Sequence, residues 1–194
     1  MKVLAINGSA RRDGNTAIML DTVLAEMPAG TETNLIQLAG MPLRGCTACR
    51  RCAQTQDRRC AVKGDSFNDI FAMMTEADAI ILGSPVYVAG PTPEIKMLID
   101  RACVVARANH GLMRRKLGAA VVAQRRGGAV SAFDALNHFF FISEMIVVGS
   151  NYWNMGFGGA SGEVKDDAEG LETMRVLGRN LAWLLPRVVG QPHA

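Results

Sequence analysis

Buried strands and amphipathic helices alternate along the whole chain, and this alternation limits the possible folds more than any other feature. The expected strands are short apolar runs that are typical of strands buried on both faces. Such strands, separated by helices, occur in parallel sheets that are covered by helices on both sides, so we predict an α/β fold. The expected strands are residues 3–6, 33–37, 79–83, 117–123 and 146–149, and the expected helices cover about 15–27, 66–74, 92–107, 130–145 and 166–186.

Five strands of this kind favour a flavodoxin-like, doubly wound parallel sheet with strand order 2-1-3-4-5. Ligands of such sheets bind at the carboxyl ends of the strands where the order reverses, so the loops after the first, third and fourth strands should meet there. The length of 194 residues fits a single domain, 1–194, with a cysteine-rich insertion at 40–64 before the third strand. That insertion contains no convincing strand or helix, and such a segment usually marks function.

The composition argues against several classes of protein. No apolar run approaches the length of a membrane span, so we expect no membrane association. The net charge of +3 is mild, and the basic residues are not interleaved with aromatic ones, so we expect no nucleic-acid partner. The N-terminus has the pattern of a buried strand rather than a signal peptide, which favours a cytoplasmic location. In that compartment cysteines are more often metal ligands or redox thiols than disulfides, and Cys103, in a helical pattern, is expected to be a buried thiol.

Four of the five cysteines lie close together in the insertion. Cys46, Cys49 and Cys52 are separated by two residues each, and Cys60 follows after seven more. Three thiols at this spacing can surround one face of a compact inorganic core, and a fourth can complete a [4Fe-4S] site. Zinc is an alternative, although its sites favour two separated cysteine pairs, and so are metal-free thiols or a disulfide. No glycine lies in the segment 54–59 to turn the chain back, which makes Cys60 the least secure ligand.

The loop after the first strand, residues 7–16, is expected to bind a phosphate. Its glycines permit tight turns, and its hydroxyls and amides lie at the positive end of the following helix. The loop lacks the sequences of nucleoside-triphosphate and dinucleotide loops, so a terminal phosphate monoester fits best. The candidate ligands are Ser9, Arg11, Gly14, Asn15 and Thr16.

Two further loops are expected to hold a flat heteroaromatic ring. The loop after the third strand offers a stiff, apolar wall that contains two prolines. In the loop after the fourth strand, glycines allow close approach, and Arg125 or Arg126 can face negative charge that develops on a reduced ring, although a solvated turn explains the two arginines equally well. The candidate residues are Pro85, Val86, Tyr87, Val88, Arg126, Gly127 and Gly128.

Three motifs together point to a family. They are Gly-Ser-x-Arg-x-x-Gly-Asn-Thr at 8–16, Cys-x-x-Cys-x-x-Cys in the insertion, and Gly-Ser-Pro-Val-Tyr at 83–87 followed by Lys96 and Asp100-Arg101. With these motifs the chain resembles, over nearly its whole length, the iron-sulfur flavoproteins of the NADPH-dependent FMN reductase family. The resemblance implies FMN with its phosphate in the loop 9–16 and its ring near 85–88 and 126–128. It also implies a [4Fe-4S] cluster on the four cysteines, and a homodimer or homotetramer in which one subunit's cluster lies near another's flavin.

We therefore expect an FMN-dependent oxidoreductase that passes electrons between FMN and a cluster. The expected donor is a small ferredoxin-like protein or NAD(P)H, and no catalytic acid, base or nucleophile is required. One alternative is an NAD(P)H-dependent FMN or quinone reductase without a working cluster. Another is a non-catalytic module whose redox state alters its assembly. Assembly is supported by the apolar tract 139–142, because three consecutive aromatic residues cannot all face one side of a helix.

Overall fold

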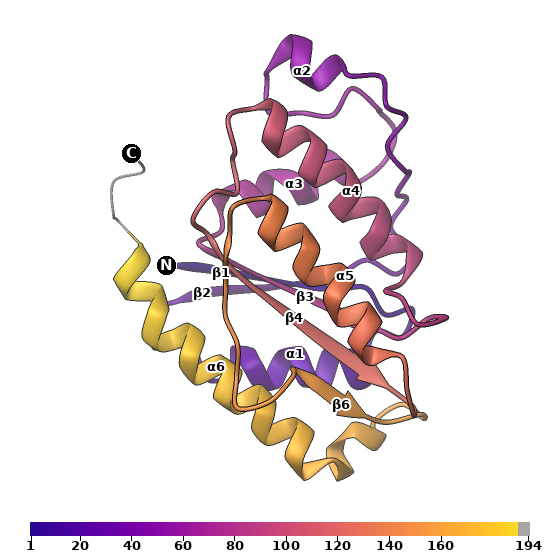
Figure 1. Cartoon of the computed structure of the whole chain (residues 1–194), viewed down its shortest axis with the longest axis vertical. Coiled ribbons are helices and arrows are strands. Elements are labelled where there is room, and N and C mark those ends of the chain that lie inside the picture. Colours follow the sequence, from indigo (N-terminus) through magenta and orange to yellow (C-terminus); the bar gives the residue numbers. More distant parts are fainter. Residues whose placement is uncertain (190–194) are drawn as a thin grey trace.

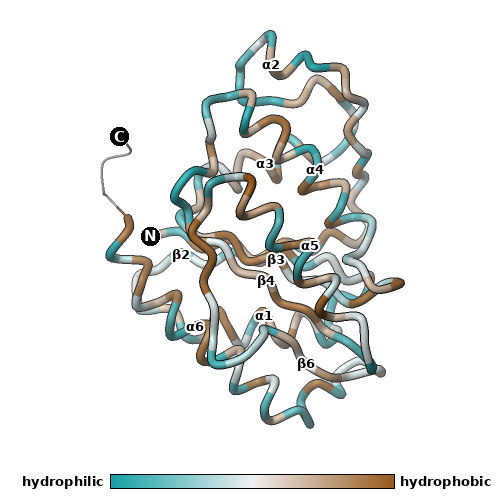
Figure 2. Tube along the Cα trace, in the orientation of Figure 1, coloured by the Kyte–Doolittle hydropathy of each residue, from teal (hydrophilic) through white to brown (hydrophobic). Residues whose placement is uncertain are grey.

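Side chains of the central strands point alternately to two separate apolar layers. In β1 (Lys2–Asn7), Val3 contacts one layer and Leu4 the other, and β3 (Ala79–Pro85) shows the same alternation. The computed structural model therefore has a parallel sheet with helices on both faces, as Figure 1 shows. Figure 2 shows the apolar residues along β3 and beside it, whereas polar residues follow the outer turns.

The strand order is β2-β1-β3-β4-β5, which confirms the predicted flavodoxin-like sheet. The order reverses at β1, so the loops after β1 and β3 lie at the point where ligands bind in such sheets. The structure describes residues 1–189, and the last residues of the expected domain, 1–194, lie outside the described residues. The other strands of this path are β2 (Glu32–Gln37), β4 (Leu117–Gln124) and β5 (Ile146–Val147).

The fifth position of the sheet differs from the prediction of one strand at 146–149. Only Ile146 and Val147 pair there, and they pair with the start of β4. A further short strand, β6 (Met155–Phe157), pairs with the end of β4. Two strands of two and three residues thus replace one expected strand. Runs this short carry almost no periodic signal, so the sequence could not reveal the division.

Helices cover both faces of the sheet (Figure 1). Asp167 caps the last helix by accepting a hydrogen bond of 3.0 Å from the Gly170 amide, and this helix continues past Pro186, where it was expected to end. No helix within residues 1–189 is both long and apolar enough to cross a membrane. α1 (Asn15–Leu24) and α6 (Ala168–Val188) cover one face, and α3 (Phe67–Glu76), α4 (Pro93–Ala108) and α5 (Ala129–Ile142) cover the other.

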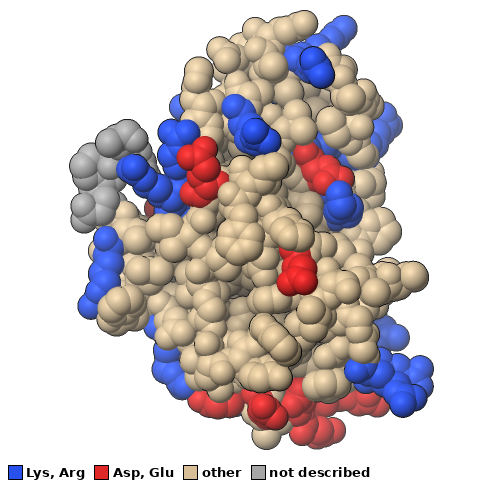
Figure 3. All heavy atoms as spheres, viewed as in Figure 1, with Lys and Arg blue, Asp and Glu red and all other residues tan. Residues whose placement is uncertain are grey.

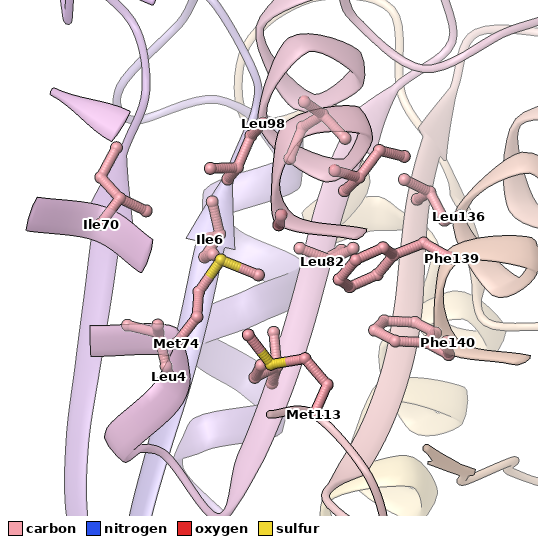
Figure 4. Packing of buried hydrophobic residues seen from close by; sticks show 14 of the residues in the cluster. Leu4, Ile6, Ile70, Met74, Leu82, Leu98, Met113, Leu136, Phe139 and Phe140 are labelled. Atoms are coloured by element: carbon pink, nitrogen blue, oxygen red, sulfur yellow. The ribbon is translucent and has the colours of Figure 1, made fainter. Parts of the chain in front are cut away.

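The aromatic tract of α5 divides between core and surface, as predicted. Phe139 and Phe140 point from α5 toward the sheet, and Met74 of α3 lies in the same core (Figure 4). Phe141 and Ile142, by contrast, are 62% and 52% exposed. One side of this helix therefore packs in the core, and the other leaves apolar surface in contact with solvent.

Gly118 of β4 lies directly against Phe140 of α5. A Cβ atom there would lie 2.6 Å from Phe140 Cδ1. We expect Gly118→Ala to lower the free energy of unfolding by about 1–3 kcal/mol, the usual cost of overpacking a core. Urea unfolding of the purified protein measures this loss. Gly149→Ala is the matched control, because a Cβ at Gly149 meets nothing within 4 Å, and equal losses in the two variants would contradict the prediction.

Candidate functional site

Three loops meet at the carboxyl ends of β1, β3 and β4 and enclose a pocket of about 180 Å³. This is the position predicted from the strand order. The segment that follows β6 closes one side of the pocket. The lining residues are Ser9, Arg11, Asn15, Thr16, Pro85, Val86, Tyr87, Ala123, Arg125, Gly158 and Gly159.

The first of these loops presents the N-terminus of α1 to the pocket. Gly14 precedes the helix in an extended conformation and has no side chain to cap it, so the amides of the first turn are available to a ligand. The loop itself is held in place, because the Ser9 amide donates to Asn7 Oδ1 at 2.9 Å and Ser9 Oγ accepts from the Arg11 amide at 3.1 Å. These amides, with the helix dipole and the hydroxyls of Ser9 and Thr16, form a site suited to a phosphate group.

Asn15 uses its side chain to position the segment after β6. Its Nδ2 donates to the Ala160 carbonyl at 2.8 Å, and its Oδ1 accepts from the Gly162 amide at 2.8 Å. Gly158 lies so close that a Cβ atom there would be 2.6 Å from Asn15 Nδ2. Asn15 therefore lines the pocket and also shapes it. Gly158 and Gly159 line the pocket but were not among the predicted site residues, because they follow a strand that was not expected.

The second loop forms a tight turn beside the pocket. Tyr87 and Gly90 exchange backbone hydrogen bonds of 2.8 and 2.9 Å, and Val88 and Ala89 between them have φ values of 49° and 57°. This turn directs Val86 and Tyr87 to the pocket lining, whereas Val88 is fully exposed at the tip. A β-branched residue rarely adopts such a left-handed conformation, so the contacts on either side of the turn must enforce it.

The third loop places Arg125 in the pocket lining and Arg126 outside it. Both were considered from the sequence, but only Arg126 was named as a candidate site residue, although the sequence contains nothing to distinguish the two. Arg126 and Gly127 are exposed, and Gly128 precedes α5 with a φ of 90°. A Cβ on Gly128 would lie 3.1 Å from Val86 Cγ1, so this glycine permits close contact between the second and third loops.

The four predicted cysteine ligands line a second cavity, of about 190 Å³. Cys46 and Cys49 are exposed, Cys52 is buried and Cys60 is half-buried. Within residues 1–189, no three Cys, His, Asp or Glu side chains converge closely enough to hold a single metal ion. A zinc ion needs four ligands at about 2.3 Å from one point, whereas the cysteines of a cubane bind a larger core. Four thiols spaced around a cavity of this size therefore fit a [4Fe-4S] core better than zinc.

The chain turns back toward Cys60 without a glycine. A short helix, α2 (Arg51–Thr55), was not predicted, and Gln56 and Arg58 follow it with φ values of 47° and 60°. Each left-handed residue of this kind costs roughly 1–2 kcal/mol, so other contacts must stabilise the turn. One is the hydrogen bond of 2.9 Å that the Arg58 amide donates to Asn109 Oδ1. The missing glycine therefore does not keep Cys60 from the cavity.

Asn68, on α3, fixes the backbone of Cys60 by two hydrogen bonds. The Cys60 amide donates to Asn68 Oδ1 at 2.8 Å, and Asn68 Nδ2 donates to the Cys60 carbonyl at 3.0 Å. An asparagine within a helical pattern gave no sequence signal for this role. These two hydrogen bonds hold Cys60, the last of the four clustered cysteines, in a defined position at the cavity.

A buried ion pair joins α4 to both ends of the cysteine segment. The side chains of Arg101 and Asp65 are fully buried, and Arg101 Nη1 donates to the Asp65 carboxylate and, at 3.1 Å, to the Arg44 carbonyl. The guanidinium also lies 4.0 Å from the Phe67 ring centroid, a favourable cation–π contact. Burial acts to lower the pKa of Arg101, but the nearby Asp65 carboxylate and Cys60 thiol raise it overall, so the residue stays charged.

The thiols differ in their environments. A hydrogen bond from the Arg51 amide is the main cause that lowers the pKa of Cys49, whereas burial raises the pKa of Cys52. Cys103, expected to be a buried thiol, is half-buried against the core, and burial raises its pKa too. It does not line the cavity, which is consistent with a packing role.

Removing Asp65 tests the importance of the ion pair. We expect Asp65→Ala to lower the free energy of unfolding by about 3–5 kcal/mol, because it leaves the Arg101 charge buried without its partner. The arginine-rich segment 50–59 should then be cleaved faster by trypsin. Urea unfolding and timed proteolysis measure these effects. Asp100→Ala is the control, because Asp100 forms an exposed ion pair with Lys96 on α4, the helix that carries Arg101. Equal losses of stability and equal rates of cleavage in the two variants would contradict the prediction.

Comparison with protein families matches residues 1–160 to NADPH-dependent FMN reductases. An iron-sulfur flavoprotein of Methanocaldococcus jannaschii is 40% identical over 190 residues, which cover 94% of this chain and 96% of the relative. An iron-sulfur flavoprotein of Methanosarcina thermophila is 30% identical over 189 residues, which cover 95% of each chain.

Solved structures share the fold at low sequence identity. The WrbA-like flavodoxin of Agrobacterium tumefaciens has a TM-score of 0.65 at 19% identity, over 96% of this chain and 98% of that chain. An NADH:FMN oxidoreductase in its apo form has a TM-score of 0.66 at 16% identity, over 98% of this chain and 91% of that chain. The fold, the matched family and the full-length relatives agree: the chain belongs to the NADPH-dependent FMN reductase family, among the iron-sulfur flavoproteins, and it is an FMN-dependent oxidoreductase.

Proposed function

We propose that the chain is an electron-transfer flavoprotein that carries FMN and a [4Fe-4S] cluster and passes electrons between them. The observation that carries the proposal is the second cavity, which all four clustered cysteines line together with a buried cation, Arg101. The names of the full-length relatives support the same assignment. When bound, FMN supplies two-electron and one-electron exchange, and a cluster supplies one-electron exchange.

The residues of the first pocket bind and orient FMN in this proposal. The phosphate binds at the N-terminus of α1, where first-turn amides and the helix dipole stabilise its charge. Arg125 adds a positive charge at the lining, which stabilises negative charge that develops on the ring upon reduction. The phosphate ligands are Ser9, Arg11, Gly14, Asn15 and Thr16, and the ring lies against Pro85, Val86 and Tyr87 beside Arg125. The other residues that were expected near the ring lie outside the pocket lining; they are Val88, Arg126, Gly127 and Gly128.

The four thiols of the second cavity hold the cluster in this proposal. Cys46, Cys49 and Cys52 come from the compact start of the segment, and Cys60 completes the set from the far side of α2. The exposure of Cys46 and Cys49 leaves one side of the cluster near solvent, where a redox partner can approach. The buried Cys52 packs instead within the core beneath α4.

The electron donor is proposed to be a small, acidic, ferredoxin-like protein, with NAD(P)H as the alternative. Exposed arginines surround the cysteine segment, and Figure 3 shows blue side chains over the end of the molecule that carries α2. Their charge would attract an acidic carrier and raise its rate of encounter, with a strong dependence on ionic strength. The arginines of this surface are Arg44, Arg50, Arg51, Arg58 and Arg59.

We also propose that the chain forms a homodimer or homotetramer. Large apolar side chains are exposed on α5 and on the loop that leads to β6, including Phe141, Ile142, Tyr152 and Trp153. Exposed apolar patches of this kind usually mark interaction sites. A second copy of the chain would cover them and would also bring the cluster of one subunit toward the flavin of another.

The second candidate is an NAD(P)H-dependent FMN or quinone reductase without a working cluster. The family match favours it, because the family is described as NADPH-dependent FMN reductases and that description names no cluster. Anaerobic absorption spectroscopy separates the two functions. Broad absorbance with stoichiometric iron and acid-labile sulfide supports the flavoprotein with a cluster. A yellow protein that retains FMN without iron or sulfide favours the simple reductase.

Thr16→Val tests the phosphate site. The hydroxyl lies in the first turn of α1, and a hydrogen bond to a charged group contributes about 1.5–3 kcal/mol, so we expect the Kd for FMN to rise about tenfold or more. Affinity for riboflavin, which lacks the phosphate, should change little. Fluorescence titration of flavin-free protein measures both values. Thr22→Val, further along the helix and outside the pocket, is the control, and an equal loss for riboflavin would refute the phosphate assignment.

Cys60→Ser tests the fourth ligand of the cluster. We expect the variant to lose iron, sulfide and the broad visible absorbance, while its FMN content stays unchanged, because the two sites have separate linings. Cys103→Ser is the control, because Cys103 lies outside the cavity. This variant should retain both the cluster and FMN. A Cys60→Ser protein with full iron and sulfide content would exclude Cys60 from the ligand set.

A further inference from the structure

Arg101 carries two buried nitrogen atoms that have no partner among the described residues. Its Nε and Nη2 are both inaccessible to solvent and make no hydrogen bond, although the side chain is fully buried. Buried donors on a charged group are costly when they are unpaired, so native proteins rarely leave them so. The two N–H groups therefore lack a well-formed hydrogen bond, although the Cys60 thiol lies near enough to interact with the guanidinium.

The position of Arg101 indicates where these groups can find an acceptor. Nη1 is already occupied by the Asp65 carboxylate and the Arg44 carbonyl, which fixes the orientation of the planar guanidinium. Arg101 also lines the cavity of the four cysteines, and the Cys60 thiol is close enough to raise the pKa of Arg101. The nearest place for an acceptor is therefore the cysteine cavity.

A purely structural role accounts for only part of this geometry. The ion pair with Asp65 and the contact with the Phe67 ring explain why a cation lies here. They do not explain the unpaired Nε and Nη2. Stability alone does not require the pair either, because proteins in which apolar side chains replace a buried ion pair are often at least as stable. The arginine is better explained if its remaining donors face a charged occupant of the cavity.

We propose that Arg101 sets the reduction potential of the cluster by donating hydrogen bonds from Nε and Nη2 to the Cys60 sulfur and the adjoining cluster sulfides. This inference rests on the proposed function, because it needs a cluster in the cavity. If the bound cluster took up one electron, Arg101 would form and break no covalent bond and would keep its proton, since a guanidinium stays protonated. Arg101 is a positioning and tuning residue that acts on the potential of the site.

The ion pair gives the proposal a direction that can be tested. Reduction adds one negative charge to the cluster, so the positive charge of Arg101 and its hydrogen bonds to sulfur favour the reduced form. Asp65, the other member of the buried ion pair, opposes reduction of the cluster by its negative charge. Loss of Arg101's charge must therefore lower the potential, and loss of Asp65's charge must raise it. Opposite signs separate an electrostatic action on the cluster from an effect of lost packing, which has no reason to change sign between the two variants.

The experiment is an anaerobic redox titration of the purified holoprotein, with the reduced cluster followed by electron paramagnetic resonance. At a fixed applied potential near the native midpoint, Arg101→Gln should lower the ratio of reduced to oxidised cluster about tenfold, which is about 59 mV for one electron. Asp65→Asn should raise that ratio. Arg107→Gln is the control, because Arg107 lies on the same helix but is exposed and does not line the cavity, so its ratio should change much less.

Iron, sulfide and FMN contents of every variant distinguish the possible failures. A native protein without iron and sulfide refutes the proposed function, and the inference fails with it. A native protein with a full cluster whose potential is unchanged in Arg101→Gln, or shifts in the same direction in Asp65→Asn, refutes the inference alone. If Arg101→Gln loses its cluster, Asp65→Asn decides the question, because its potential must rise.

Discussion

Close contact between α4 and the loop after β1 is the constraint on which both candidate sites depend. A Cβ atom at Gly8 would lie 2.1 Å from Ile95 Cγ1, so only glycine allows the helix to pack here. Thr92, just before the helix, donates from Oγ1 to the Gly8 carbonyl at 2.8 Å, and its amide donates to Ser84 Oγ at 3.0 Å. The start of α4 is thereby fixed to the loop after β1 and to the end of β3, both of which border the flavin pocket.

The later turns of the same helix hold the cysteine segment. Arg101 binds the base of the segment through Asp65, and Asn109, just after the helix, accepts from the Arg58 amide at the returning turn. The nine residue steps from Thr92 to Arg101 span roughly 14 Å at about 1.5 Å per residue. A rigid helix, rather than a flexible linker, therefore sets the separation between the two sites within one chain.

The sequence predicted the sheet and the meeting of its loops, because both follow from periodicity and strand order. It did not predict the division of the fifth strand, since two and three paired residues carry no pattern, and it could not choose between Arg125 and Arg126. The ion pair joins residues 36 positions apart and has no local signal. A charged Arg101 on the apolar face of a predicted helix, beside Leu98 and Ala102, was the one sign that something here needed a buried cation.

The cysteine segment breaks local rules that the rest of the chain obeys. Ala48, Arg50, Gln56 and Arg58 all have positive φ values without being glycine, and a fully buried arginine lies beneath them with two unpaired nitrogens. A loop selected only for stability would have glycine at such turns and apolar side chains below. Departures of this kind gather where function requires them. Positive charge, unused donors and four thiols around one cavity are the features that the proposed iron-sulfur cluster would require.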